Sequence, residues 1–70
     1  MLDTAKVKGL REKRGLTQAQ AGAAAELSTS EAFARQRWNA IESGREANLT
    51  LDTLGRVAKA LGVKAKDLLK

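Results

Sequence analysis

Residues 34–45, Ala-Arg-Gln-Arg-Trp-Asn-Ala-Ile-Glu-Ser-Gly-Arg, contain the pattern that decides the fold. Ala34, Trp38 and Ile41 recur at positions i, i+4 and i+7, which is the spacing of a buried stripe on an α-helix. Gly44 follows where a helix commonly ends in a left-handed residue. The stretch therefore predicts a helix that ends just before Gly44 and carries Trp38 as the central anchor of the core.

The opposite face of this helix is polar and lightly charged. At about 100° per residue, the side chains that point away from the buried stripe are those of Arg35, Gln36, Asn39 and Ala40.

Two helices are expected before this one. The first spans about residues 3–14, with Val7 and Leu10 on one side, and Gly15 stands where a left-handed C-cap belongs. The second runs from Gln18 to about Ala25. Because its body is nearly all alanine, it buries little apolar area.

A capping box opens the second helix. The hydroxyl of Thr17 is expected to accept from the amide of Gln20, while the Gln20 side chain returns to the amide of Thr17. Gly22 permits another backbone to approach closely. Residues 28–31, Ser-Thr-Ser-Glu, fit either a second capping box or a polar turn, and the boundary there stays open.

A loop and a strongly periodic helix follow. Thr50 is the expected N-cap, Gly62 with Val63 fits a Schellman-type end, and residues 68–69, Leu-Leu, form a short last helix. The sequence thus predicts an all-α fold, a compact bundle of about five short helices. Its expected core comprises Val7, Leu10, Leu16, Trp38, Ile41, Leu51, Leu54, Val57, Ala58 and Leu61.

Length and composition narrow the class of protein. Seventy residues fit one small domain, expected over residues 1–70. No apolar run reaches the roughly 20 residues of a membrane span, and no secretory signal is recognisable, so we expect a cytoplasmic location. Cys and His are absent, which removes thiol and imidazole chemistry and the usual zinc ligands. We therefore expect no enzyme, no metal and no cofactor.

The charge balance nominates a polyanion as partner. Thirteen Lys and Arg residues stand against eight Asp and Glu, which gives a net charge of +5 and a pI near 10.1. Such a surface attracts nucleic acid, although a merely soluble basic surface has the same composition.

Four short blocks of sequence, taken in their order along the chain, carry a resemblance to a known family. They are residues 10–11 (Leu-Arg) with 15–18 (Gly-Leu-Thr-Gln), 38–45 (Trp-Asn-Ala-Ile-Glu-Ser-Gly-Arg), 49–54 (Leu-Thr-Leu-Asp-Thr-Leu) and 58–63 (Ala-Lys-Ala-Leu-Gly-Val). Together they resemble the Cro/C1-type (XRE) family of helix-turn-helix proteins over about residues 5–69. The resemblance implies a lambda-repressor-like domain whose second and third helices read double-stranded DNA, the third lying in the major groove.

The resemblance also implies which residues contact DNA. The expected base contacts are Arg35, Gln36, Asn39 and Ala40, of which Ala40 departs from the usual polar residue and is suited to touching a thymine methyl group. The expected contacts to the DNA backbone are Thr17, Gln18, Arg37, Arg45, Asn48 and Thr50. For Gln18 the alternative is a capping role, and for Arg45 a solvated surface charge. Arg11 and Glu42 match a structural ion pair of the family.

One departure from the family affects the site. The spacing from Thr17 to Glu42 is about six residues longer than usual, and the glycine turn between the second and third helices is missing. The extra residues fall within 26–33. Three arrangements are open at this point: the extra residues lengthen the second helix, they extend the third helix at its N-terminus, or they form a loop packed by Leu27 and Phe33. An extended third helix would bring Ser28, Thr29, Ser30 and Ala32 near the DNA.

The expected function is sequence-specific binding of double-stranded DNA by a transcriptional regulator, either a repressor, which is the expectation in the first place, or an activator. The expected location is a prokaryotic cell or phage host, in association with the nucleoid. Val63, Leu68 and Leu69 either form a homodimer surface or close the core of the monomer. The alternative function is an antitoxin-like protein-interaction module with the same fold and a protein partner. An enzyme would rest on scattered carboxylates, those of Glu26, Glu31 and Asp67, which have no partner base.

Overall fold

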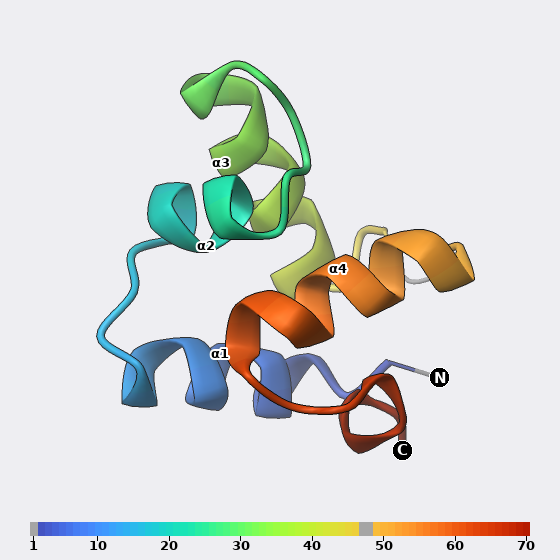
Figure 1. The fold of residues 1–70 in the computed structure, drawn as a ribbon. Coiled ribbons are helices and arrows are strands. Elements are labelled where there is room, and N and C mark those ends of the chain that lie inside the picture. Colours follow the sequence, from blue (N-terminus) through green and yellow to red (C-terminus); the bar gives the residue numbers. More distant parts are fainter. Residues whose placement is uncertain (1, 47–48) are drawn as a thin grey trace.

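The helices and their order follow the sequence pattern closely. The computed structural model describes residues 2–46 and 49–70. The elements are α1 (Thr4–Lys13), α2 (Gln18–Ala24), α3 (Glu31–Glu42), α4 (Leu51–Leu61) and a short 3₁₀ helix, η1 (Ala65–Leu68) (Figure 1). The expected all-α fold is confirmed. No helix among these residues is both long enough and apolar enough to span a membrane.

Side-chain caps fix where three of the helices begin. The Asp3 carboxylate accepts from the amide of Lys6 at 3.1 Å at the start of α1. The expected capping box at α2 is present, with Gln20 N to Thr17 Oγ1 at 3.1 Å and Thr17 N to Gln20 Oε1 at 2.9 Å. At α4, Thr50 Oγ1 accepts from the amide of Thr53 at 3.1 Å. Each cap satisfies a backbone N–H that the first turn leaves without a helical partner.

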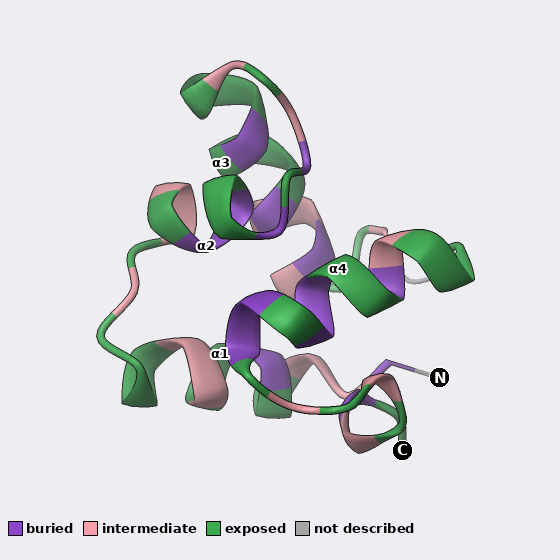
Figure 2. Cartoon of the chain, viewed as in Figure 1, coloured by how far each residue is buried: buried purple, intermediate pink, exposed green. Residues whose placement is uncertain are grey.

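The core forms around the stripe of α3. Trp38, Ile41 and Val7 are fully buried, as are Val57 of α4 and Leu68 of η1 (Figure 2). The predicted core residues Leu54, Ala58 and Leu61 are also buried, whereas Leu10 and Leu16 are partly buried and pack against the core.

The prediction for Leu51 is wrong. This side chain is 87% exposed, because it belongs to the first residue of α4, at the exposed end of that helix (Figure 2). Leu49, two residues earlier, packs against the core instead. The periodicity of the helix marks a face correctly, but it cannot show that the first turn of α4 extends past the helices that would cover it.

The two ends of the described chain meet. The amide of Asp3 donates to the carbonyl of Leu68 at 2.7 Å, and Leu2 forms an isolated antiparallel bridge with Leu69. Leu68 is fully buried and Val63 packs against the core, while Leu69 is 45% exposed. A homodimer surface that includes Leu68 is therefore wrong, since this side chain closes the core of the monomer.

The connection from α2 to α3 explains the six additional residues. Helix α2 ends at Ala24 and is not lengthened, whereas α3 begins at Glu31, about one turn before the start of the buried stripe at Ala34. Leu27 lies in the connection and is buried, whereas Phe33 belongs to the first turn of α3 and is 62% exposed, so Leu27 alone of the two expected residues packs the loop. Residues 28–30 form the polar turn: Ser30 N donates to Ser28 Oγ, and no side chain caps α3.

Glu26 occupies the place of the missing glycine. Its φ is 55°, which makes it the one non-glycine residue with positive φ among the described residues. The amides of Glu26 and Leu27 donate to the carbonyls of Ala23 and Gly22, at 3.0 and 3.1 Å, which is the bond pattern of a Schellman motif. A non-glycine side chain in this conformation costs roughly 1–2 kcal/mol.

Helices α2 and α3 touch backbone to backbone at Gly22. A Cβ atom on Gly22 would collide with the carbonyl oxygen of Ala34, and both residues are buried. The small residue at this position is what permits the close crossing of the two helices (Figure 1).

We expect Glu26→Gly to raise the free energy of unfolding by about 1 kcal/mol, because glycine adopts positive φ without steric cost. Chemical denaturation measures the change. Glu26→Ala is the matched control, since it removes the carboxylate and keeps the Cβ atom, and it should stay within about 0.5 kcal/mol of the wild type. Equal stabilisation by both variants would contradict the backbone explanation.

We expect Gly22→Ala to lower the free energy of unfolding by about 1–3 kcal/mol, because the added methyl group forces α2 and α3 apart. Gly55→Ala is the matched control on α4, where an added Cβ meets nothing within 4 Å. This second change should stabilise the protein by about 0.5–1 kcal/mol through helix propensity. Thermal unfolding of the two variants in parallel decides the sign of each effect, and destabilisation by both would refute the account.

Candidate nucleic-acid interface

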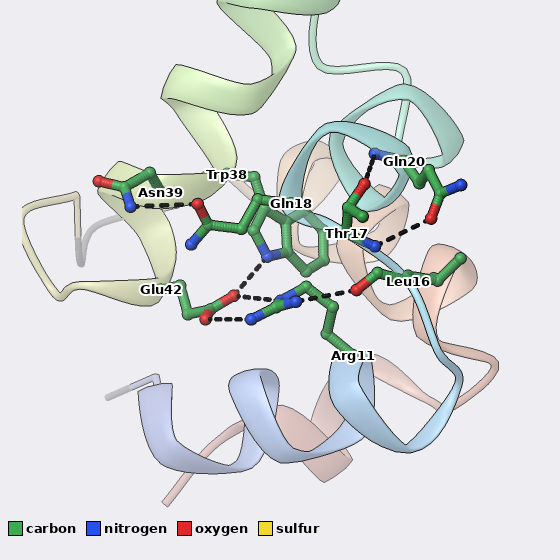
Figure 3. A network of polar contacts seen from close by, with 8 residues as sticks. All are labelled: Arg11, Leu16, Thr17, Gln18, Gln20, Trp38, Asn39 and Glu42. Carbon is green, nitrogen blue, oxygen red and sulfur yellow. Dashed lines mark hydrogen bonds and ion pairs between the residues drawn. The ribbon is translucent and has the colours of Figure 1, made fainter.

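A polar network joins α1, α3 and the loop before α2. Arg11 donates to Glu42 twice, from Nε to Oε2 at 2.8 Å and from Nη2 to Oε1 at 3.0 Å (Figure 3). Its Nη1 donates to the carbonyl of Leu16 at 2.8 Å, and Nε1 of Trp38 donates to Glu42 Oε2 at 2.6 Å. The expected Arg11–Glu42 ion pair is therefore present in two-pronged geometry, with side chains 13% and 6% exposed.

The environment keeps both groups of this pair charged. Burial raises the pKa of the Glu42 carboxyl, but the hydrogen bonds from Arg11 and Trp38, with the nearby positive charge, outweigh burial and hold that pKa below its usual value. The hydrogen bond with Glu42 likewise raises the pKa of Arg11, against the opposing effect of burial. The network thus fixes the C-terminal end of α3 against α1 and against the residue that precedes α2.

The outward face of α3 borders a shallow hollow. Gln36, Asn39 and Ala40 of α3 line it together with Arg45 and Glu46 of the following loop, around a volume of about 400 Å³. Three of the four expected base-contact residues therefore share one concave surface. The fourth, Arg35, lies on the same helix and is exposed to solvent.

A chain of hydrogen bonds connects this surface to the start of α2. Arg45 Nη2 donates to Asn39 Oδ1 at 2.8 Å. Asn39 Nδ2 in turn donates to Gln18 Oε1 at 3.3 Å, as Figure 3 shows. Arg45 Nε also donates to Ser43 Oγ at 3.2 Å. Gln18 is thus held against α3, while Gln20 supplies the cap of α2. Side chains from α2, α3 and the following loop are therefore positioned as one unit.

The other residues expected to contact the DNA backbone differ in their exposure and in their hydrogen bonds. Arg37 is 44% exposed, and its guanidinium donates to the carbonyl of Leu27 and to Glu46, so it ties α3 to the loop that precedes it. Thr17 and Thr50 are exposed, and their hydroxyls cap α2 and α4. The prediction for Asn48 lies outside the described residues.

Two residues beside this surface were not among the expected contacts. Lys8 of α1 lines a second hollow of about 230 Å³ with Gln18, Asn39, Glu42 and Ser43. The signal was present in the sequence, because Lys8 precedes Arg11 by three residues and so lies on the same side of α1. Phe33 is exposed at the first turn of α3 and lies three residues before Gln36 and seven before Ala40, which places it on their face of the helix.

The side chains that line the two hollows are mostly polar or charged. Among the residues that the structure describes, no group of three or more acidic side chains is arranged to hold a metal ion. The groups that line the two hollows are amides, a hydroxyl, cations, the methyl group of Ala40 and the carboxylates of Glu42 and Glu46, each paired with an arginine. Amide and guanidinium groups on a helix face are suited to hydrogen bonds with base edges.

Comparison with known proteins gives one family. A family model described as "Helix-turn-helix domain" matches residues 5–69, almost the whole chain. No curated protein sequence and no solved structure matches the chain.

We expect Glu42→Gln to lower the free energy of unfolding by about 2–3 kcal/mol at pH 7, because Arg11 then loses its counter-charge. This deficit should shrink in acid. The folded-state pKa of Glu42 lies below the unfolded-state value of about 4.3, so its stabilisation is complete above that value and is lost as the pH falls through the folded-state pKa. Denaturation curves from pH 7 to pH 2 measure the difference between the two proteins.

The matched control is Glu46→Gln, which removes the partner of Arg37 at the surface. Both side chains of that pair are about 40% exposed, so its loss should cost less than about 1 kcal/mol. A deficit for Glu42→Gln that stays constant down to pH 2 would show that the charge of Glu42 is not what stabilises the network.

Proposed function

The chain belongs to the helix-turn-helix domain family, which suggests a DNA-binding regulator, and from this premise we propose that it binds double-stranded DNA sequence-specifically with α3 in the major groove. The observation that carries the proposal is the hydrogen-bonded unit of Gln18, Asn39 and Arg45 beside the outward face of α3. A major groove about 12 Å wide admits one such helix.

Specific base recognition is assigned to the exposed face of α3. Arg35 has the donors to bind guanine O6 and N7 in a two-pronged contact, and Gln36 or Asn39 can pair in the same way with adenine. Ala40 offers a methyl group to thymine, and Phe33 extends this apolar edge by two turns toward the helix N-terminus. Asn39 already bonds to Gln18 and Arg45, which fixes the orientation of its amide before DNA arrives.

Contacts to the sugar-phosphate backbone are assigned to the residues on either side of this face. Arg45 and Lys8 carry positive charge at the edges of the two hollows. Gln18 lies at the first turn of α2, where backbone N–H groups and the helix dipole favour an anion. Thr17, Arg37, Asn48 and Thr50 complete the proposed set.

In the cell, this activity corresponds to a transcriptional regulator, and a repressor that occupies an operator is the simplest form. A cytoplasmic, nucleoid-associated location follows from that role. A two-fold dimer on half-sites about 34–36 Å apart would add specificity to so small a domain. Since Leu68 is buried, a dimer would have to use other residues, with Leu69 as one exposed apolar side chain near the C-terminus.

A protein-interaction module is the second candidate function. Two exposed apolar side chains favour it, Phe33 at 62% and Leu51 at 87% exposure, because large apolar side chains at a surface often mark a contact with another protein. They lie at the N-terminal ends of α3 and α4.

Selection of bound duplexes from a random pool tests the proposed function. We expect an enriched motif, and Arg35→Ala should reduce discrimination at one base pair by about 1–3 kcal/mol, which is roughly 5- to 150-fold.

Arg45→Gln should weaken binding to all sequences alike and lower the slope of log affinity against log salt by about one, the value for one phosphate contact. Arg56→Gln is the matched control, because Arg56 is a surface arginine paired with Asp52 on α4. Absence of any enriched motif at about 50 mM salt would overturn the proposal and favour the protein-interaction module.

A further inference from the structure

The positive charge of the chain is unevenly distributed. Residues 17–56, which include α2, α3 and the first half of α4, contain four basic and five acidic side chains. The two terminal segments, residues 1–16 and 57–70, contain nine basic and three acidic side chains. The whole net charge of +5 therefore originates in the segments outside the helix-turn-helix unit.

The two terminal segments form one side of the molecule. The amide of Asp3 bonds to the carbonyl of Leu68, and Leu2 pairs with Leu69, at one end of α1. At the other end, the guanidinium of Arg14 lies so close to Gly62 that a Cβ atom there would collide with it. Figure 1 shows α1 and η1 together on the side of the molecule away from the start of α3.

The lysines of α1 on this side point away from the recognition helix. Arg11 points toward α3, where it binds Glu42. Lys6 and Lys13 lie about 140° and 160° from Arg11 around the helix axis. Lys8, by contrast, lies about 60° from Arg11, and it lines the hollow beside Gln18.

Seven exposed cations make up what we name the basic face: Lys6, Lys13, Arg14, Lys59, Lys64, Lys66 and Lys70. The ion pairs among residues 2–46 and 49–70 involve Arg11, Arg37 and Arg56, so none of the seven is in an ion pair there. Of the three carboxylates on this side, those of Asp3 and Asp67 accept from the backbone amides of Lys6 and Lys64. Seven cations against three carboxylates, those of Asp3, Glu12 and Asp67, leave a net charge of +4 on this side of the molecule.

We propose that the basic face binds the phosphate backbone of a second double-stranded DNA segment while α3 occupies the first, so that one protein molecule bridges two duplexes. DNA carries one negative charge per about 1.7 Å of its axis, which complements a broad array of flexible lysines. Six of the seven cations are lysines, which act as point charges on mobile stems and read no bases. Binding at the basic face is therefore independent of sequence and sensitive to salt.

A two-duplex capture experiment tests this inference. A biotinylated duplex that contains the selected motif is immobilised, the protein is bound, and a labelled duplex of unrelated sequence is added at about 50 and 200 mM salt. We expect capture of the labelled duplex at the lower concentration and its loss at the higher. The triple variant Lys6→Gln, Lys13→Gln, Lys66→Gln should reduce capture at least tenfold and lower the slope of log affinity against log salt by about 2–3. It should change the affinity for the immobilised duplex less than threefold.

The reciprocal control is Arg35→Gln with Arg45→Gln, on the recognition side. This variant should lose its preference for the immobilised motif and keep an equal, salt-sensitive affinity for the immobilised duplex and for unrelated DNA. Capture that survives in the triple lysine variant, or binding of the basic face to anionic phospholipid vesicles in place of the second duplex, would overturn the inference.

The two proposals fail in different ways. An enriched motif without capture of the second duplex would remove the bridging inference and leave sequence-specific recognition by α3 in place. The bridging inference rests on the proposed function, so salt-sensitive binding through the basic face without any motif would remove both recognition by α3 and the bridge, and would leave one sequence-independent site. Thermal unfolding of each variant verifies that the exposed substitutions leave the fold intact.

Discussion

The hydrogen bonds that converge on the Glu42 carboxylate hold α3 in place against α1. Arg11 from α1 and Trp38 from α3 both donate to this group, and Arg11 also holds the carbonyl of Leu16 just before α2. In a chain of 70 residues the core is small, and the directional hydrogen bonds of this partly buried network add to the apolar contacts that hold the helices together. Arg11 thus contacts α3 and the loop that leads into α2.

The contact of α2 with α3 adds a second constraint, and it is steric. Gly22 lets the backbone of α2 reach the carbonyl of Ala34, so the two helices cross without an intervening side chain. The chain then has to reverse within a few residues, and Glu26 does so with positive φ. The strained residue is tolerated because Leu27, the next residue, is buried in the core.

The charged side chains are distributed unevenly between the surface around α3 and the basic face. The surface around α3 is nearly neutral and rich in amides, which favours orientation and discrimination over bulk attraction. The basic face carries the excess charge and has no comparable arrangement of fixed polar groups in the described structure. If both surfaces bind nucleic acid, sequence preference and salt-dependent affinity reside on different sides of the same small domain.

The sequence by itself determined the helices, their caps and most of the core. The stripe through Trp38 and the cap residues Thr17 and Thr50 are local patterns whose meaning depends on neighbours three or four residues away. The ion pair of Arg11 with Glu42 joins residues 31 apart, and it was reached through family resemblance, not through periodicity.

Tertiary structure decided the rest, because the remaining features depend on which surfaces meet. Leu51 fits the helical pattern, yet it lies where no other helix covers it, and Leu68 is buried by a contact with the opposite end of the chain. The sequence of residues 28–31 fits either a capping box or a polar turn, and the structure has the turn, with α3 beginning at Glu31. The separation of charge also depends on tertiary structure, because the two basic terminal segments come together on one side only when the chain is folded.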